Sequence, residues 1–219
     1  MKIKGEVGYK ALTPIMRVLF RIWYNPKIIG KEKIPKKGSI IIVCNHKHVL
    51  DQCPIIMSTK RVLHYMAKKE YFDGKLKWFF KLVGCIPVDR SIHDAVAKEK
   101  ALEVLNSSGA IGLFPEGTRN KTYDTLLLPF KFGAVSMAKK TGATIIPSAI
   151  TGDYCFRSKN LILRFGTPFK VSKEDNLEEV NNKLYEEMTS LIKQNLKETN
   201  RTLEEELSSR NQDQKKKKE

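Results

Sequence analysis

Two side chains, His46 and Asp51, have the types and the spacing of a catalytic base and its support. They bound the sequence HKHVLD, directly after the apolar run 39–44. Across a strand-to-helix turn, this spacing lets the carboxylate fold back onto one imidazole nitrogen, which favours the cation formed when the other nitrogen takes a proton. The chain has no Gly-x-Ser-x-Gly sequence, so the pair predicts a general base without a serine nucleophile. Taken alone, it is equally consistent with a capping and packing pair.

A metal site is the second hypothesis for this stretch. Cys44, His46, His48, Asp51 and Cys53 crowd together in the sequence. Their spacing matches no common zinc pattern, and the alternation of side chains along a strand would scatter them. We therefore rank a metal centre, and the metal hydrolase that it would imply, below the general base, and we expect no metal.

Three further blocks come at or after apolar runs. GCIPVDR (84–90) places Arg90 at the end of a short strand, and IPSAI (146–150) puts a proline inside one, where it could shape the wall of a cleft. FPEGTRN (114–120) has turn chemistry. In it, Arg119 offers a planar fork for a phosphate, Gly117 permits close backbone approach, and Glu116 could orient a hydroxyl or hold a cation. A surface ion pair and an ordinary turn are the plain alternatives.

The segments that contain and flank these blocks are predicted to alternate between strands and helices. Apolar runs predict strands at 39–45, 62–67, 85–88, 110–115, 144–150 and 161–166, and helical periodicity predicts helices at 11–24, 51–60, 75–83, 94–105, 132–140 and 176–197. This order predicts an α/β layered domain over residues 38–198, with a largely parallel or mixed central sheet flanked by helices. Sites in such sheets gather at strand ends. Residues 199–219 are polar, and we expect a frayed or disordered tail.

Positive charge is concentrated near the N-terminus. The net charge is +16, and residues 1–50 alone carry +9. Such a field indicates an anionic partner, namely a membrane surface, a nucleic acid or a phosphorylated substrate. No helix–turn–helix or RNA-binding sequence occurs, so we expect no nucleic acid. No apolar stretch approaches the roughly 18 residues of a membrane span, so a transmembrane helix is not expected.

Together the blocks resemble the glycerolipid acyltransferase family. Asn-His-x4-Asp, Gly-x-Ile-Pro-Val-Asp-Arg, Phe-Pro-Glu-Gly-Thr-Arg-Asn and Ile-Pro-Ser-Ala occur in this order and spacing, and the resemblance covers roughly residues 10–195. Within the family, the chain looks most like the bacterial 1-acylglycerol-3-phosphate (lysophosphatidic acid) acyltransferases. The tail beyond residue 198 lies outside the pattern.

The resemblance implies acyl transfer to the 2-hydroxyl of 1-acylglycerol 3-phosphate, making phosphatidic acid in phospholipid synthesis. His46 would be the general base and Asp51 its support, and the donor would be an acyl thioester of coenzyme A or acyl carrier protein. No metal or prosthetic group is implied. The headgroup would be bound by residues that match the family's blocks, with Lys131 just beyond them: Arg90, Glu116, Gly117, Thr118, Arg119 and Lys131.

The resemblance also gives the basic N-terminus a purpose. In residues 1–37, the predicted helix 11–24 carries a broad apolar surface (Leu12, Ile15, Met16, Leu19, Phe20 and Trp23), and Arg17 and Arg21 form a polar stripe. We expect this segment to dock on anionic lipid at the inner face of the cytoplasmic membrane, as a peripheral or monotopic protein. The alternative is a helix packed on the protein's own sheet.

Rival functions remain at this stage. The nearest is the same chemistry on glycerol 3-phosphate or another lysophospholipid. A more distant rival is a non-catalytic basic protein that binds nucleic acid or anionic lipid, which the charge favours and the His46–Asp51 pair does not.

Overall fold

The core of the molecule is one mixed sheet. The computed structural model describes residues 5–89, 91–92, 94–122 and 124–215, with side chains as far as residue 209. In this part of the chain seven strands run in the order β1-β7-β6-β2-β5-β3-β4, and all neighbours are parallel except β6 and β7. The strands are β1 Lys27–Ile29, β2 Ile40–Cys44, β3 Leu63–Lys68, β4 Ile86–Val88, β5 Ala110–Leu113, β6 Thr144–Thr151 and β7 Ile162–Phe165.

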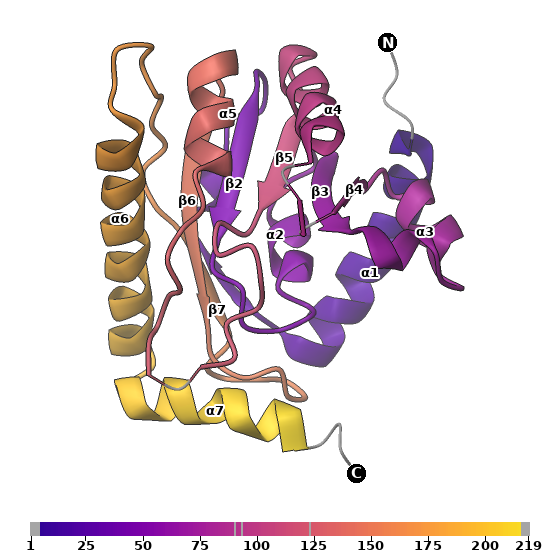
Figure 1. Ribbon diagram of the computed structural model, residues 1–219. Helices are drawn as coiled ribbons and strands as arrows, with labels where there is room; N and C mark the ends of the chain where they lie inside the picture. The colour runs from indigo at the N-terminus through magenta and orange to yellow at the C-terminus, as the bar shows by residue number, and fades with distance from the viewer. Residues whose placement is uncertain (1–4, 90, 93, 123, 216–219) are drawn as a thin grey trace.

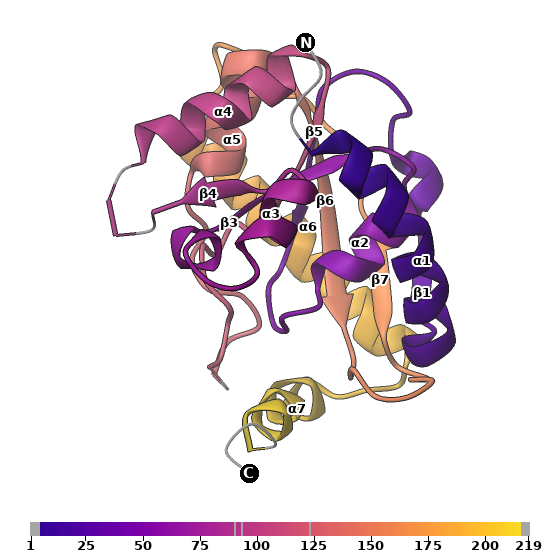
Figure 2. The same cartoon turned by 90° about the vertical axis from the view of Figure 1, so that its right-hand side faces the viewer.

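Helices cover both faces of the sheet, as Figure 2 shows. All five residues of β2 are buried, so its alternate side chains serve two cores. Ile41 and Val43 pack in the core beneath α4, α5 and α6, whereas Ile40 and Ile42 pack in the core that includes residues of α1 and α2. The predicted α/β class is confirmed. The helices are α1 Glu6–Tyr24, α2 Gln52–Ser58, α3 Lys77–Leu82, α4 Ala95–Asn106, α5 Gly133–Thr141, α6 Leu177–Glu198 and α7 Leu203–Lys215, with short 3-10 turns at Lys31–Lys33 and Lys69–Phe72.

The N-terminal segment is built into this domain, which differs from the expected boundary at residue 38. Strand β1, which the sequence analysis missed, pairs in parallel with β7 at the edge of the sheet. Tyr9, Phe20 and Ile34 are buried. The apolar pair Ile28 and Ile29 therefore extends the sheet.

Helix α1 presents one face to the protein and another to the outside. Arg17 donates to the carbonyl oxygen of Ile56 at 3.0 Å and to that of Thr59, and Arg21 donates to the carbonyl oxygen of Pro26 at 2.8 Å. Both arginines of the predicted polar stripe are therefore bound to backbone carbonyls of the protein. The outer face of α1 carries a set of exposed apolar side chains, Val7, Ile15, Val18, Leu19, Ile22 and Trp23. Among the described helices, none is long and apolar enough to cross a membrane.

The C-terminal segment is helical over residues 203–215, where the sequence analysis expects a frayed or disordered tail. A reciprocal cap starts α7: the hydroxyl of Thr202 accepts the N–H of Glu205 at 3.1 Å, and the Glu205 carboxylate accepts the N–H of Thr202 at 2.8 Å. In Figure 1, α7 lies across the end of the molecule toward which β2 points. The sequence T-L-E-E at 202–205 is the signal for this cap, and contacts of Glu206 with Lys47 and Gly152 complete the anchoring of α7. Residues 216–219 lie outside the described part.

Candidate active site

The loop after β2 places His46 against Asp51, as their spacing predicts. The Asp51 side chain is fully buried, and its Oδ2 lies 2.8 Å from Nδ1 of His46. The same oxygen accepts the backbone N–H groups of Lys47 and His48, both at 2.7 Å. The other oxygen accepts the hydroxyl of Tyr154 at 2.7 Å. Four donors therefore fix the carboxylate, and a buried charge is retained only with such partners.

The ring and the backbone of His46 are also held in place by contacts of their own. Its ring stacks on Phe114, with centroids 4.0 Å apart and planes inclined by 11°. Its backbone N–H donates to Oε1 of Glu116 at 2.8 Å, and its carbonyl accepts the N–H of Asn120 at 2.7 Å. The block 114–120 thus braces the ring and both backbone groups. With Nδ1 donating to Asp51, the lone pair on Nε2 is left to accept a proton.

Glu116 has a positioning role in this arrangement. It is 4% exposed, and its two carboxylate oxygens accept the backbone N–H groups of His46 and Leu128, at 2.8 and 2.9 Å. The carboxylate therefore ties the end of β2 to the loop that precedes α5. Contact of Glu116 with a substrate headgroup stays a prediction.

The other residues predicted to bind a headgroup lie beside the same loop, with one exception. Gly117 has φ of +69°, and a Cβ there would lie 2.7 Å from Cε of Lys131, so the lysine stem runs against the turn. Thr118 is exposed and Arg119 is partly buried, and within the described residues no side-chain partner is found for Arg119. Arg90 lies outside the described residues. Headgroup binding by this set stays a prediction.

Two residues to which the sequence analysis gave no site role lie beside the site: Tyr154 from the loop after β6, and Asn45 of the Asn-His-x4-Asp block, directly after β2. Burial, reinforced by the charge of Asp51, raises the pKa of Tyr154 well above its ordinary value, which keeps the phenol a donor to Asp51. Its ring also stacks on His48, with centroids 4.2 Å apart. The amide of Asn45 bonds both backbone groups of Ile150, at 2.9 and 2.8 Å. Each residue comes just after a strand, which is the signal that could have found it.

The cysteines near the loop do not form a metal cluster with it. Burial raises the pKa of the Cys53 thiol to about 12 and that of Cys44 higher still, so both stay protonated. Cys44 points into the apolar core shared with Ile40 and Ile42. Among the described residues, no three His, Cys, Asp or Glu side chains are placed to hold a metal ion.

An α/β sheet that presents a supported histidine at the end of a central parallel strand has the geometry that a general-base enzyme needs. A comparison with known families identifies the class of protein. The model of the acyltransferase family matches residues 25–151, and the chain belongs to this family.

Two bacterial relatives are similar over two thirds or more of their length. The 1-acyl-sn-glycerol-3-phosphate acyltransferase of Borreliella burgdorferi is 33% identical over 178 residues, which cover 76% of this chain and 68% of the relative. The enzyme of the same name from Bacillus subtilis is 28% identical over 166 residues, or 73% and 81% of the two chains. The crystal structure of the LPA acyltransferase PlsC from Thermotoga maritima superposes with a TM-score of 0.67 over 84% of this chain and 78% of that one, at 22% identity. The two chains share a fold.

Proposed function

We propose that this protein transfers a fatty acyl group from an acyl thioester to the 2-hydroxyl of 1-acylglycerol 3-phosphate, making phosphatidic acid. The contact between His46 and the buried carboxylate of Asp51 carries the proposal, because it leaves Nε2 as the proton acceptor. The names of the relatives in Borreliella burgdorferi and Bacillus subtilis support the choice of acceptor.

The chemistry needs one base and no covalent acyl-enzyme. Nε2 of His46 takes the proton of the glycerol hydroxyl as its oxygen attacks the thioester carbonyl. Asp51 stabilises the resulting imidazolium through Nδ1. When the tetrahedral intermediate collapses, the carbon–sulfur bond breaks and His46 returns its proton to the leaving thiolate. Ester and free thiol are the products, and the histidine is again neutral.

The acceptor phosphate would meet the positive side chains beside the turn 116–120. Arg119 can offer a bidentate fork, and Lys131 adds a point charge next to Gly117. Glu116, Gly117 and Thr118 shape this turn, whereas the role of Arg90 rests on the family resemblance alone. Glycerol 3-phosphate and other lysophospholipids carry a phosphate too, so they belong in any test.

The co-substrate would be acyl-CoA or acyl-acyl carrier protein, and no metal or prosthetic group would take part. Both donors present the same thioester, so the base needs nothing further. Dialysis against a chelator should leave turnover unchanged, and loss of activity restored by a metal would contradict this point.

The acceptor resides in a membrane, and the outer face of α1 suits that location. Its apolar side chains are exposed, with Trp23 55% exposed and stacked edge-on against Phe156 at 5.2 Å. Apolar area and aromatic rings at one helix face favour the membrane interface. We place the protein at the inner face of the cytoplasmic membrane, peripheral or monotopic, where the +9 charge of residues 1–50 favours anionic lipid.

An acceptor panel tests the proposed reaction. Purified protein, vesicles and a labelled acyl thioester are combined in turn with lysophosphatidate, glycerol 3-phosphate, a lysophospholipid of another headgroup, and monoacylglycerol. We expect phosphatidate, identified by mass, with lysophosphatidate as the best acceptor. Equal use of monoacylglycerol would remove the phosphate from the specificity, and a preference for glycerol 3-phosphate would establish the nearest rival.

A further inference from the structure

A buried ion pair joins the C-terminal helix to the loop that carries His46. Glu206 on α7 is 1% exposed, and its Oε1 lies 2.5 Å from Nζ of Lys47, whose side chain is 4% exposed. Lys47 is the neighbour of His46. Two charged side chains that are so deeply buried are stable only when each has a close partner. This pair is therefore a specific contact between α7 and the loop.

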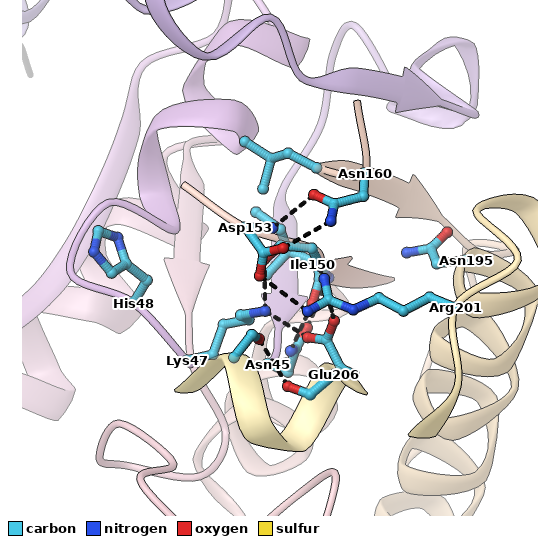
Figure 3. Close-up of polar contacts among 12 residues, drawn as sticks. Asn45, Lys47, His48, Ile150, Asp153, Asn160, Asn195, Arg201 and Glu206 are labelled. Atoms are coloured by element: carbon cyan, nitrogen blue, oxygen red, sulfur yellow. Dashed lines mark hydrogen bonds and ion pairs between the residues drawn. The ribbon is translucent and has the colours of Figure 1, made fainter. Parts of the chain in front are cut away.

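Backbone and charge partners complete the cluster, which Figure 3 shows converging from three segments of the chain. Oε2 of Glu206 accepts the N–H of Gly152 at 3.0 Å and lies 3.4 Å from a guanidinium nitrogen of Arg201. Nζ of Lys47 donates to the carbonyl oxygen of Gly152 at 2.7 Å. Arg201 pairs in turn with Asp153 at 3.0 Å. Glu206 therefore clamps the loop after β2 and the loop after β6 together.

Both clamped loops supply donors to Asp51. Lys47 contributes its backbone N–H, and Tyr154, two residues after Gly152, contributes its hydroxyl. A shift of either loop would move Asp51 relative to His46. An unbroken series of contacts therefore runs from Glu206 to the proposed base, through Lys47 on one side and through Gly152 and Tyr154 on the other.

We propose that Glu206 is a positioning residue, which holds the two loops so that Asp51 stays aligned with His46. The inference that this alignment serves acyl transfer rests on the proposed function. Glu206 acts through Lys47 and Gly152 and touches no substrate. Its removal leaves the buried ammonium of Lys47 without its carboxylate, so the loops relax, and the reaction loses transition-state stabilisation more than substrate binding.

The variant Glu206→Gln tests this in the full-length protein, with Glu204→Gln as its matched control. Glu204 is an exposed residue of the same helix, and the substitution removes the same charge. We expect kcat of Glu206→Gln to fall about tenfold with KM for acceptor and donor within about twofold, and Glu204→Gln to match wild type. Glu206→Asp, which keeps the charge, should recover part of kcat. Circular dichroism at the assay temperature verifies that all variants are folded.

Hydrogen–deuterium exchange supplies a readout that needs no activity. In Glu206→Gln, the amides of peptides that cover residues 45–51 and 150–156 should exchange faster, because the donors to Asp51 and Glu206 are released. Glu204→Gln should leave them protected. Unchanged exchange in these peptides, or kcat within twofold of wild type in Glu206→Gln, would overturn the proposal. A wild-type protein inactive on the whole acceptor panel would instead defeat the proposed function, and exchange would still decide whether Glu206 holds the loops.

Discussion

The loop that carries His46 and the outer face of α1 satisfy their side chains in opposite ways. In the loop, polar groups are buried and bonded, and Asp51 alone accepts four donors. On α1, large apolar groups are exposed, with Val7 79% and Leu19 62% accessible. Fixed geometry is what proton transfer needs, whereas exposed apolar area is what a docking surface needs. We therefore expect the two regions to fail differently when altered.

The largest expected effect is on the base. His46→Ala should lower kcat by about 10²–10⁴-fold on bilayer and water-soluble acceptors alike, because it removes the proton acceptor. Asp51→Asn should also be strongly damaging, since the imidazolium loses its supporting charge. Steady-state kinetics on both acceptor types is the measurement. Wild-type turnover in His46→Ala would contradict this comparison, because the hydrogen-bonded loop that carries His46 would then have no chemical role.

Making the outer face of α1 polar should affect only the reaction on an acceptor that resides in a bilayer. The double variant Leu19→Ser, Trp23→Ser should bind anionic vesicles at least about 100-fold more weakly, since each apolar side chain buried in the lipid contributes about 1.5–3 kcal/mol and about 1.4 kcal/mol corresponds to tenfold in affinity. Activity on a short-chain soluble acceptor should be retained. Vesicle flotation measures the binding, and Val96→Ser, an exposed position on α4, is the matched control. Undiminished flotation would assign docking to another surface, with exposed Trp78 on α3 as the next candidate.

Arg119 separates binding from chemistry within the site. Arg119→Ala should raise KM for lysophosphatidate about tenfold with little change in kcat, because the phosphate is bound equally in ground and transition states. Arg119→Lys should restore part of the affinity, since a point charge cannot reproduce the fork. A fall in kcat at unchanged KM would contradict the assignment of Arg119 to phosphate binding. It would group Arg119 with the residues that hold His46 in place.

Tyr154 tests how many donors the carboxylate needs. Tyr154→Phe keeps the ring stacked on His48 but removes the hydroxyl from Asp51. We expect a loss of about 1.5–3 kcal/mol in the free energy of unfolding, the usual worth of a hydrogen bond to a charged group, and a several-fold lower kcat. Chemical denaturation and kinetics measure both. Unchanged values would show that the other three donors suffice.

The smallest expected effect is on the stability of the protein at acidic pH. Burial opposes ionisation of Asp153, but hydrogen bonds from Asn160 and Arg201 and the positive charges of Arg201 and Lys47 outweigh it and lower the pKa. The unfolded chain then binds the proton first, so this stabilisation is present above the ordinary aspartate pKa of about 3.9 and is lost as pH falls through the lower folded value. Asp153→Asn should flatten the acid side of a plot of thermal midpoint against pH. An identical acid slope would contradict the contribution.

Much of the fold was predictable because its signals are local. Apolar runs and helical periodicity gave the alternating elements, since burial on both faces of a parallel strand demands continuous apolar side chains, as in β2. Strand β1 was not predictable in this way. Three residues have too little pattern, and only the neighbouring β7 makes them a strand.

By itself, the sequence determined the pairing of His46 with Asp51 and the turn at 114–120, because residues a few positions apart across a turn must lie close together. Only the tertiary structure decided the contacts made across the chain. Tyr154 is 103 residues from Asp51, and Glu206 is 159 residues from Lys47. It likewise decided that Arg17 and Arg21 of α1 bind carbonyls of the protein while the apolar face stays exposed. Helical periodicity gives the composition of each face, but which face is covered depends on the partner that packs against it.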